Sequence, residues 1–378
     1  RRWDTRDHDP DHPERVDPNG VPYPPFHDMQ SVVDGDAATA ITELVAERWE
    51  AAACKPLELG SSMQDPWPDG VLPDFEHQDI AIARTCPPLG DRPGIYEIEA
   101  LFVDMIGTAE KTIYIENQFL TADVIAHAVA ARMKARPELE TILVSSKEPH
   151  GFLETHSMAT GRERFMQHLN EAGVIDRVRL VYPRVPDGSA AGQDVQIHSK
   201  FMVIDDRSLR IGSANLNNRS MGTDGECDLV VAGDTPDTRA RIACLRNNLL
   251  GEHLGLSLED AASEIERHNS LRALIDARAD EPRSLRRIPF EVGANEALSQ
   301  VVTVVADPER PGDVSRFMGN MLSARPAGLP IRGRILTAGA IALATLLFAV
   351  WQYSPLAEFT EPARLEQLIV SLRGDPWA

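Results

Sequence analysis

Short apolar runs alternate with helix-like patterns over most of the chain. Apolar residues in continuous or alternating positions predict strands at residues 79–84, 111–116, 140–146, 177–183, 195–205, 209–213 and 227–233. Apolar residues three and four positions apart predict helices at residues 36–52, 96–109, 122–135, 162–172, 235–250 and 258–277. Strands that alternate with helices are typical of an α/β fold, in which helices flank a layered sheet.

Two stretches lack this pattern and are predicted to be connections. Residues 5–27 are polar and rich in proline, and we interpret them as a solvated loop. Their acidic and imidazole side chains could be imagined as a metal cluster, but nothing in the sequence fixes their geometry; they are Asp7, His8, Asp9, Asp11 and His12. Residues 279–330 contain several prolines and few apolar positions, which predicts a linker.

One segment near the end of the sequence predicts a transmembrane helix. Residues 335–350 carry no charge, and the aromatic-rich residues after them extend the stretch toward the roughly 20 residues that span a bilayer. Arginines precede the stretch, and Trp351 and Tyr353 follow it as an interfacial aromatic belt does. We predict one transmembrane helix at 331–353, with the preceding part of the chain in the cytoplasm.

Composition and charge narrow the classes of function. The 378 residues carry a net charge of −20, which disfavours general binding to nucleic acid, because that affinity comes largely from Lys and Arg meeting phosphates. The four cysteines stand at 54, 86, 227 and 244 and form no C-x-x-C pair, so we predict no cysteine zinc site. The sequence also lacks a glycine-rich phosphate loop and an acidic metal cage beside the motif described next, so we predict chemistry without a metal or cofactor.

The clearest chemical signal is HSKFMVIDDRSLRIGSAN at residues 198–215. His198 and Lys200 stand two apart on a predicted strand, so their side chains should face the same way. A turn and a returning strand should bring Ser213 and Asn215 beside them. A titratable imidazole, a cation and two neutral hydrogen-bonding groups suit chemistry at a phosphoryl centre.

This segment resembles the phospholipase D superfamily signature, H-x-K-x4-D-x6-G-S-x-N. All six specified positions match within residues 192–219, and they are His198, Lys200, Asp205, Gly212, Ser213 and Asn215. The resemblance implies a phospholipase D-like layered fold and a phosphohistidine mechanism. It also implies that His198 and Lys200 are catalytic, that Ser213 and Asn215 hold the phosphate, and that Asp205 and Gly212 are structural.

Further positions extend the resemblance to phospholipase D enzymes proper. The resemblance implies that Glu226, 28 residues after His198, is the acid that holds the other ring nitrogen of the histidine, where a carboxylate fixes the tautomer; the alternative is an exposed glutamate in a turn. The segment YIENQFL at 114–120 resembles one near the active site of these enzymes. It makes Asn117 and Gln118 candidate substrate-site residues, or residues that only cap the turn.

An internal repeat bears on what the chain contains. Residues 28–37 read DMQSVVDGDA and residues 226–235 read ECDLVVAGDT, and both have an acid, a Val-Val pair and a Gly-Asp that opens a predicted helix. Family members carry two signatures, whereas this chain carries one. We therefore expect the first signature to lie before residue 1 and Asp28 to orient its histidine. By resemblance that histidine is the nucleophile, and His198 is the acid–base partner.

We accordingly expect five parts in the chain. They are the tail of a first phospholipase D-like half at 1–53, a second half at 54–278, a linker at 279–330, the transmembrane helix at 331–353, and the start of a membrane-associated region at 354–378. The last two resemble the beginning of a SNARE-associated, DedA-like membrane domain.

The favoured function is hydrolysis or transphosphatidylation of glycerophospholipids at a membrane, with water or an alcohol as acceptor. The alternatives are a cardiolipin-synthase-like phosphatidyltransferase, a nucleic-acid phosphodiesterase that the charge disfavours, and a catalytically incomplete membrane-bound fragment.

Overall fold

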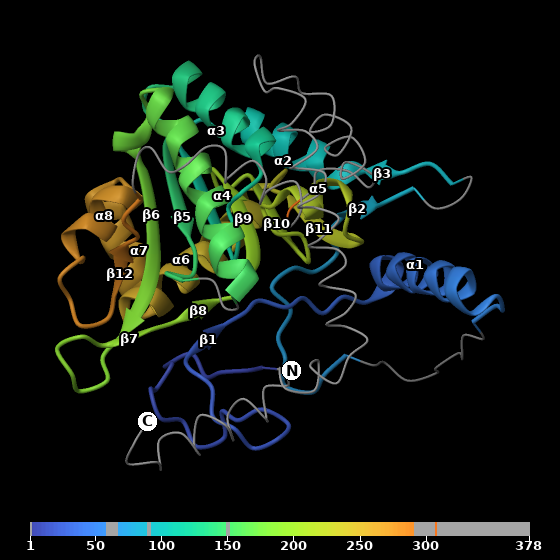
Figure 1. Ribbon diagram of the computed structural model, residues 1–378, viewed down its shortest axis with the longest axis horizontal. Helices are drawn as coiled ribbons and strands as arrows, with labels where there is room; N and C mark the ends of the chain where they lie inside the picture. The colour runs from blue at the N-terminus through green and yellow to red at the C-terminus, as the bar shows by residue number, and fades with distance from the viewer. Residues whose placement is uncertain (1, 58–66, 89–91, 149–151, 291–306, 308–378) are drawn as a thin grey trace, which may run out of the picture. The chain divides into compact units, whose positions relative to one another are not determined.

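The computed structural model describes residues 2–57, 67–88, 92–148, 152–290 and 307, which all lie within one unit of residues 1–314 (Figure 1). Within these residues, no helix is both long enough and apolar enough to cross a bilayer. The predicted transmembrane helix at 331–353 and the region at 354–378 lie outside the described residues.

A ten-stranded mixed sheet forms the centre of the unit, in the order β12-β6-β5-β4-β9-β10-β11-β2-β3, with β7 paired to β6. The pairs β4–β5 and β5–β6 are parallel, and the other pairs are antiparallel. The strands are β2 (Ile80–Cys86), β3 (Ile95–Tyr96), β4 (Thr112–Asn117), β5 (Glu140–Val144), β6 (Val178–Val185), β7 (Gln193–Asp194), β9 (Lys200–Ile204), β10 (Ser208–Gly212), β11 (Glu226–Ala232) and β12 (Ser284–Arg287).

Helices cover both faces of the sheet, which confirms the predicted α/β class. Figure 1 shows α2 (Glu97–Thr108), α3 (Asp123–Ala135) and α4 (Phe152–Glu171) together on one face, where they share an apolar core. The second core, on the other face, includes residues of α6 (Pro236–Leu254), α7 (Leu258–His268) and α8 (Leu271–Ala277). Alternation along β4 divides its side chains between the cores, since Ile113 and Ile115 join the first and Tyr114 the second.

The predicted strand at 195–205 is interrupted in the structure. The short strand β8 (Gln196–Ile197) precedes a break at His198 and Ser199, and β9 begins at Lys200. β8 pairs in parallel with β1 (Phe26–His27), which comes from the segment expected to be a solvated loop. This pairing places Phe26 and His27 directly beside the residues that precede His198.

Other boundaries also differ from the predictions. The single helix expected at 258–277 is divided at Asn269, whose φ of 51° ends α7. Part of the predicted linker belongs to the sheet, because β12 pairs with β6 and buries Leu285. Asp307, also within the predicted linker, is buried against Thr121.

Three elements complete the described chain, and they are α1 (Gly35–Ala53), η1 (Ile175–Arg177) and α5 (Asn218–Gly222). None of the residues of α1 is buried. The first copy of the predicted repeat reaches α1 without a strand over residues 28–34, whereas the second copy forms β11.

Candidate active site

His198 lies in the break between β8 and β9. Its backbone N–H donates to the carbonyl oxygen of His27 at 2.7 Å, which continues the pairing of β1 with β8. Its ring nitrogen Nδ1 lies 3.0 Å from Oδ2 of Asp28, and the ring stacks on Phe26 with centroids 5.4 Å apart. Because Nδ1 is bound to a carboxylate, Nε2 is the ring nitrogen available to a ligand.

The carboxylate that holds His198 differs from the one expected. The sequence suggested Glu226 for this place and assigned Asp28 to another histidine, but Asp28 occupies it. Asp28 follows β1 and His198 follows β8, so the parallel pairing sets the two residues side by side. Burial raises the pKa of Asp28, but the hydrogen bond and charge of His198 and the charge of Lys200 outweigh it and lower the pKa below its usual value. Asp28 is therefore an anion at neutral pH.

Glu226, at the start of β11, contacts two serine hydroxyls instead. Ser213 Oγ donates to one of its carboxylate oxygens at 2.5 Å, and Ser220 Oγ donates to the other at 2.6 Å. Burial raises the pKa of Glu226 in spite of these hydrogen bonds. Glu226 thus orients the serine that the sequence assigned to phosphate binding, rather than His198.

Lys200 begins β9, and its ammonium lies beside the backbone of His198. Nζ donates to the His198 carbonyl oxygen at 2.6 Å and to Gln118 Oε1 at 3.3 Å. Burial lowers the pKa of Lys200 to about 8, and the charges of Asp28 and Glu226 offset this only in part. Because its two hydrogen-bond partners are neutral, the ammonium is left with a charge that can meet a phosphate oxygen.

The loop after β10 carries two more signature residues and is held tightly. A Cβ at Gly212 would lie 2.0 Å from Asp228 Oδ1, so this close approach requires glycine. Asp228 accepts the N–H of Ala214 at 3.1 Å and forms a fully buried ion pair with Arg210. Asn215 keeps a buried Oδ1 without a hydrogen-bond partner in the described part of the chain. This acceptor can take a hydrogen bond from a donor group of a ligand, and the amide nitrogen of the same side chain is the atom that can donate to a phosphate oxygen.

Asn117 and Gln118, the candidate substrate-site residues, have different surroundings. Asn117 is fully buried at the end of β4, and Gln118 contacts Lys200. The side chain of Asn117 is hydrogen-bonded to backbone groups of Ala214, Leu216 and Phe119. Asn117 therefore supports the loop that carries Asn215, while Gln118 is the member of the pair that reaches the site.

Asp205 fastens the turn between β9 and β10 to the start of β4. Its carboxylate accepts three backbone N–H groups, from Glu110 at 2.6 Å, Lys111 at 2.8 Å and Thr112 at 2.7 Å. These contacts are those of a structural residue.

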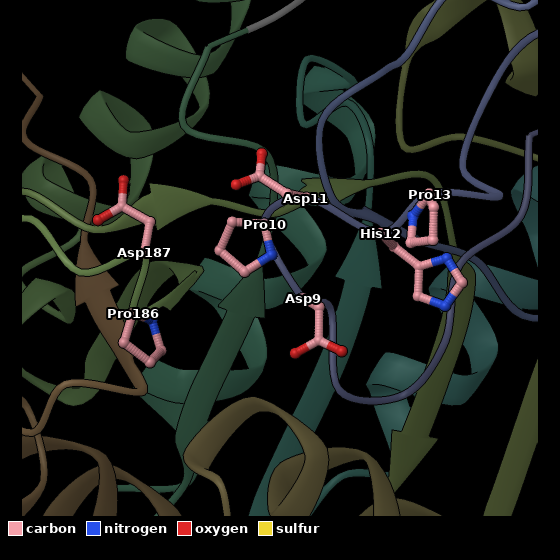
Figure 2. A pocket seen from close by; sticks show the side chains of 7 residues that line it. All are labelled: Asp9, Pro10, Asp11, His12, Pro13, Pro186 and Asp187. Carbon is pink, nitrogen blue, oxygen red and sulfur yellow. The ribbon is translucent and has the colours of Figure 1, made fainter.

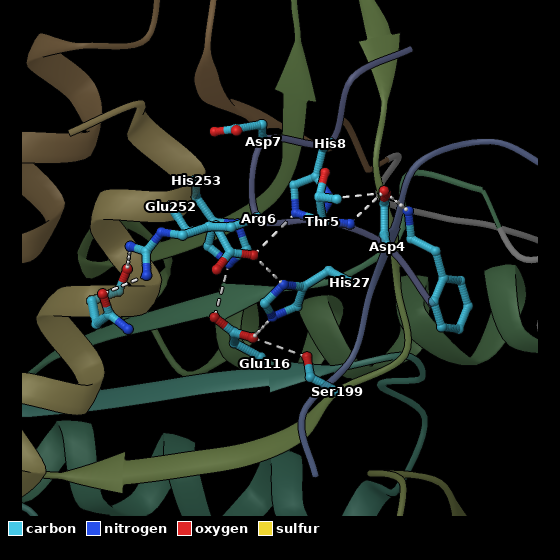
Figure 3. Close-up of polar contacts among 12 residues, drawn as sticks. Asp4, Thr5, Arg6, Asp7, His8, His27, Glu116, Ser199, Glu252 and His253 are labelled. Carbon is cyan, nitrogen blue, oxygen red and sulfur yellow. Dashed lines mark hydrogen bonds and ion pairs between the residues drawn. The ribbon is translucent and has the colours of Figure 1, made fainter. Parts of the chain in front are cut away.

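A buried group of imidazoles and carboxylates adjoins the site, and the sequence did not suggest it (Figure 3). Its centre is Glu116 on β4, which accepts four hydrogen bonds. Oε2 accepts from His27 Nε2 at 2.8 Å and Ser199 Oγ at 2.9 Å, and Oε1 accepts from His253 Nε2 at 2.9 Å and Tyr114 OH at 2.5 Å. We call these five residues the Glu116 centre.

His27 connects this centre to a second carboxylate. Its Nδ1 lies 2.7 Å from Glu252 Oε1, so both ring nitrogens face acids. Burial on its own lowers the pKa of His27, but the charge of Glu116 and the hydrogen bonds to Glu116 and Glu252 outweigh it and raise the pKa to about 10. His27 is therefore an imidazolium at neutral pH.

The chain of contacts continues into the segment predicted to be solvated. His8 bridges Glu252 and Asp4 at 3.0 Å each, and Arg15 also binds Asp4 at 2.9 Å. His8 and Arg15 are buried, which corrects the interpretation of residues 5–27 as solvated throughout. Because Glu252 comes from α6, far along the sequence, no local pattern marks these contacts.

Two trios in this region are close enough to hold a metal ion, His8–His27–Glu252 and His27–Glu116–His253. In both, each contact between a ring nitrogen and a carboxylate oxygen measures 2.7–3.0 Å, which is a hydrogen-bond distance. Glu116 also accepts two hydroxyls, and four hydrogen bonds use the roughly four lone-pair sites of a carboxylate. The geometry of Glu116 thus fits a hydrogen-bonded ion pair better than metal ligation.

A cavity of about 420 Å³ lies elsewhere on the described surface (Figure 2). Its lining residues are Asp9, Pro10, Asp11, His12, Pro13, Pro186 and Asp187. None of the signature residues lines it, and its carboxylates would repel a phosphate. We assign it no part in phosphoryl chemistry.

In a comparison with protein families, residues 102–242 match the family described as cardiolipin synthase, PLD-like domain. The matched range contains His198, Lys200, Asn215 and Glu226. It leaves out Asp28, which the structure places at His198.

The chain also matches parts of curated proteins. The chain is 28% identical over 214 residues to a phospholipase D of Phytophthora infestans, which covers 43% of this chain and 12% of that protein. It is 23% identical over 351 residues to phospholipase D alpha 1 of Nicotiana tabacum, which covers 68% of this chain and 43% of that protein. The chain thus spans less than half the length of these relatives.

Solved structures give distant matches. A phospholipase D family member, Nuc, from Salmonella typhimurium is 16% identical with a TM-score of 0.30, over 44% of this chain and 89% of that one. Phosphatidylserine synthase from Haemophilus influenzae is 14% identical with a TM-score of 0.36, over 65% of this chain and 55% of that one.

Proposed function

From the premise that this chain carries a domain of the phospholipase D superfamily, we propose that it hydrolyses or transfers the phosphodiester of a glycerophospholipid. The observation that carries the proposal is the pair of His198 and Asp28 at 3.0 Å, partly exposed and next to the ammonium of Lys200. An imidazole held by a carboxylate, beside a buried cation, is suited to moving a proton at a phosphoryl group.

In the proposed reaction His198 acts as acid and then as base. A second imidazole attacks the phosphorus and forms a P–N bond, the P–O bond to the headgroup breaks, and Nε2 of His198 gives its proton to the departing oxygen. Water or an alcohol then gives its proton to Nε2 and forms a new P–O bond as the P–N bond breaks. Lys200 and Asn215 hold the non-bridging oxygens, and Asp28 stabilises the imidazolium of His198.

The single H-x-K signature of this chain supplies one of the two imidazoles. Phosphatidylcholine hydrolysis by the 378-residue chain, measured against a chain extended upstream, tests where the other imidazole comes from. We expect turnover in the extended chain and its loss in His198→Asn of that chain. Turnover that survives His198→Asn would contradict the proposal.

The second candidate function is a phosphatidyltransferase. The description of the matched family as cardiolipin synthase favours it. Incubation with phosphatidylglycerol as both donor and acceptor distinguishes the two, since transfer yields cardiolipin and glycerol, and hydrolysis yields phosphatidic acid.

We further propose that the chain acts at a membrane, with its catalytic part in the cytoplasm, and that it does not use nucleic acid. The apolar stretch at 335–353 supports action at a membrane, Arg332 and Arg334 before it support the orientation, and the net charge of −20 disfavours nucleic acid. Fractionation of cells that express the full chain tests the first, and a salt-dependent DNA-binding assay tests the second.

A further inference from the structure

We propose that Glu116 is a positioning residue, because one of its carboxylate oxygens holds together the two backbone segments that carry His198 and Asp28. The functional part of this inference rests on the proposed function. The structural part concerns only how the pair of His198 and Asp28 is kept in register.

The first contact comes from the residue between the two signature side chains. Along β9, Phe201 and Val203 join one apolar core while Met202 and Ile204 join the other, so odd and even residues face opposite sides. Ser199 thus shares the side of Phe201, and its Oγ donates to Glu116 Oε2 at 2.9 Å. The backbone directly after His198 is fixed from the side opposite to Lys200.

The second contact comes from the residue directly before Asp28. His27 donates from Nε2 to the same oxygen, Glu116 Oε2, at 2.8 Å. The carbonyl oxygen of His27 accepts the N–H of His198 at 2.7 Å. Glu116 Oε2 therefore bridges β1 and the break before β9, one residue away from each member of the His198–Asp28 pair.

The contact between Glu116 and His27 is an ion pair, and its charges hold the two side chains together. Burial raises the pKa of Glu116, but the charges of His27 and His253 and their hydrogen bonds outweigh it and hold the pKa well below its usual range. Glu252, His253, Tyr114 and His8 also face this ion pair, and all lie in the buried or half-buried part of the protein. An ion pair that is excluded from water keeps its geometry beside the partly exposed pair of His198 and Asp28.

Two hydroxyl donors to the same carboxylate allow a matched test. Ser199→Ala removes a donor from Oε2, which holds the catalytic segments, and Tyr114→Phe removes a donor from Oε1, which does not contact them. The readout is the ¹⁵N chemical shift of His198 Nδ1 in the full chain labelled with ¹⁵N-histidine, assigned by the signal that His198→Asn loses. This readout needs no activity, so it stands even if the proposed function fails.

We expect Ser199→Ala to shift the Nδ1 signal and Tyr114→Phe to leave it in place. In an active form of the enzyme, Ser199→Ala should lower kcat by about tenfold at unchanged KM, since small displacements of reacting groups cost at least this much. Tyr114→Phe should stay within about twofold. Ser199→Thr, which keeps the hydroxyl, should restore both the signal and kcat.

A second pair of variants tests whether the negative charge of Glu116 is needed. Glu116→Gln should shift the His198 signal, whereas Glu140→Gln should not, because Glu140 is a buried carboxylate on the neighbouring strand β5 that binds the start of α8. Two results would overturn the proposal. One is an equal shift of the His198 signal in Ser199→Ala and Tyr114→Phe, and the other is an unchanged His198 signal in Glu116→Gln. An inactive wild-type enzyme with the expected signals would reject the proposed function and leave the positioning role supported.

Discussion

Two imidazole–carboxylate pairs meet at neighbouring residues, because His27 of one pair directly precedes Asp28 of the other, and the pairs differ chiefly in their access to water. His198 and Asp28 are 3.0 Å apart, with side chains 43% and 24% exposed. His27 and Glu116 are 2.8 Å apart, with side chains 3% and 0% exposed. The residue types and the contact distances are nearly the same, so the environment has to account for any difference in behaviour.

The difference teaches which of the two pairs can do chemistry. A partly exposed imidazole with one free nitrogen can exchange a proton with water or a ligand. An imidazolium enclosed by two carboxylates keeps its proton, and its value lies in fixed geometry. We therefore assign proton transfer to His198 and positioning to His27.

Removal of the exposed imidazole should give the largest effect on activity. His198→Asn should lower phospholipid turnover by about 10⁴-fold or more, since an acid–base group of this kind has no substitute in the site. The free energy of unfolding should change by less than about 0.5 kcal/mol, as for other partly exposed side chains. Vesicle hydrolysis and chemical denaturation measure the two quantities. A large loss of stability would mean that His198 belongs with the buried pair.

Removal of the carboxylate in the exposed pair should have the next largest effect. Asp28→Asn keeps the size of the side chain but removes the charge that stabilises the imidazolium, so kcat should fall by about 10²–10³-fold. Asp194→Asn is the matched control, because Asp194 also forms a half-exposed ion pair, and its carboxylate binds Lys147 rather than a signature residue. An unchanged kcat in Asp28→Asn would show that another acid, such as Glu226, orients His198 during the reaction.

The choice between Asp28 and Glu226 also shows where sequence reasoning stopped. Periodicity was sufficient to predict the main strands and flanking helices, because each of these depends on local alternation. The acid at His198 depends on the parallel pairing of β1 with β8, two strands of two residues each with no apolar alternation to reveal them. The resemblance to the family implies Glu226 at this place, whereas the pairing of β1 with β8 places Asp28 there.

The Glu116 centre and β12 could not be predicted either, because no local pattern along the chain marks them. His27, Glu116 and Glu252 come from three distant parts of the chain, and only the folded sheet brings them together. β12 reads SLRR, and its one apolar residue, Leu285, is too little to predict a strand within a proline-rich segment. The signature itself could be identified because its residues lie within one hairpin.

The buried pair of His27 and Glu116 should make the free energy of unfolding depend on pH. The pKa of His27 is raised above its unfolded value of 6.5 to about 10, so its contribution is fully present below pH 6.5 and is lost as the pH rises through 10. In His27→Gln that contribution is absent. The difference in free energy of unfolding between wild type and variant should therefore shrink by about 1.4 kcal/mol per pH unit over this window.

Chemical denaturation at a series of pH values measures this difference, and groups that titrate equally in both proteins cancel from it. His12→Gln is the control, because His12 lies in the partly exposed wall of the cavity in Figure 2. A decline in this control as steep as that of His27→Gln would show that the effect does not come from His27. A pH-independent difference for His27→Gln would mean that His27 is neutral in the folded protein, and the contrast between the two pairs would then fail.

Lys200 is buried like the His27–Glu116 pair but belongs to the signature like His198. Its titration should give the smallest of the expected effects on activity. Nζ of Lys200 donates to two neutral oxygens, so burial prevails and lowers its pKa from 10.5 to about 8. The ammonium is then the main form only below pH 8, and kcat should fall about tenfold per pH unit above that value. Lys200→Arg should be slower at neutral pH but lack this alkaline decline, because a guanidinium stays charged. A wild-type profile that is flat to pH 10 would show that the ammonium is either paired more strongly than its neutral contacts imply or not required in its charged form.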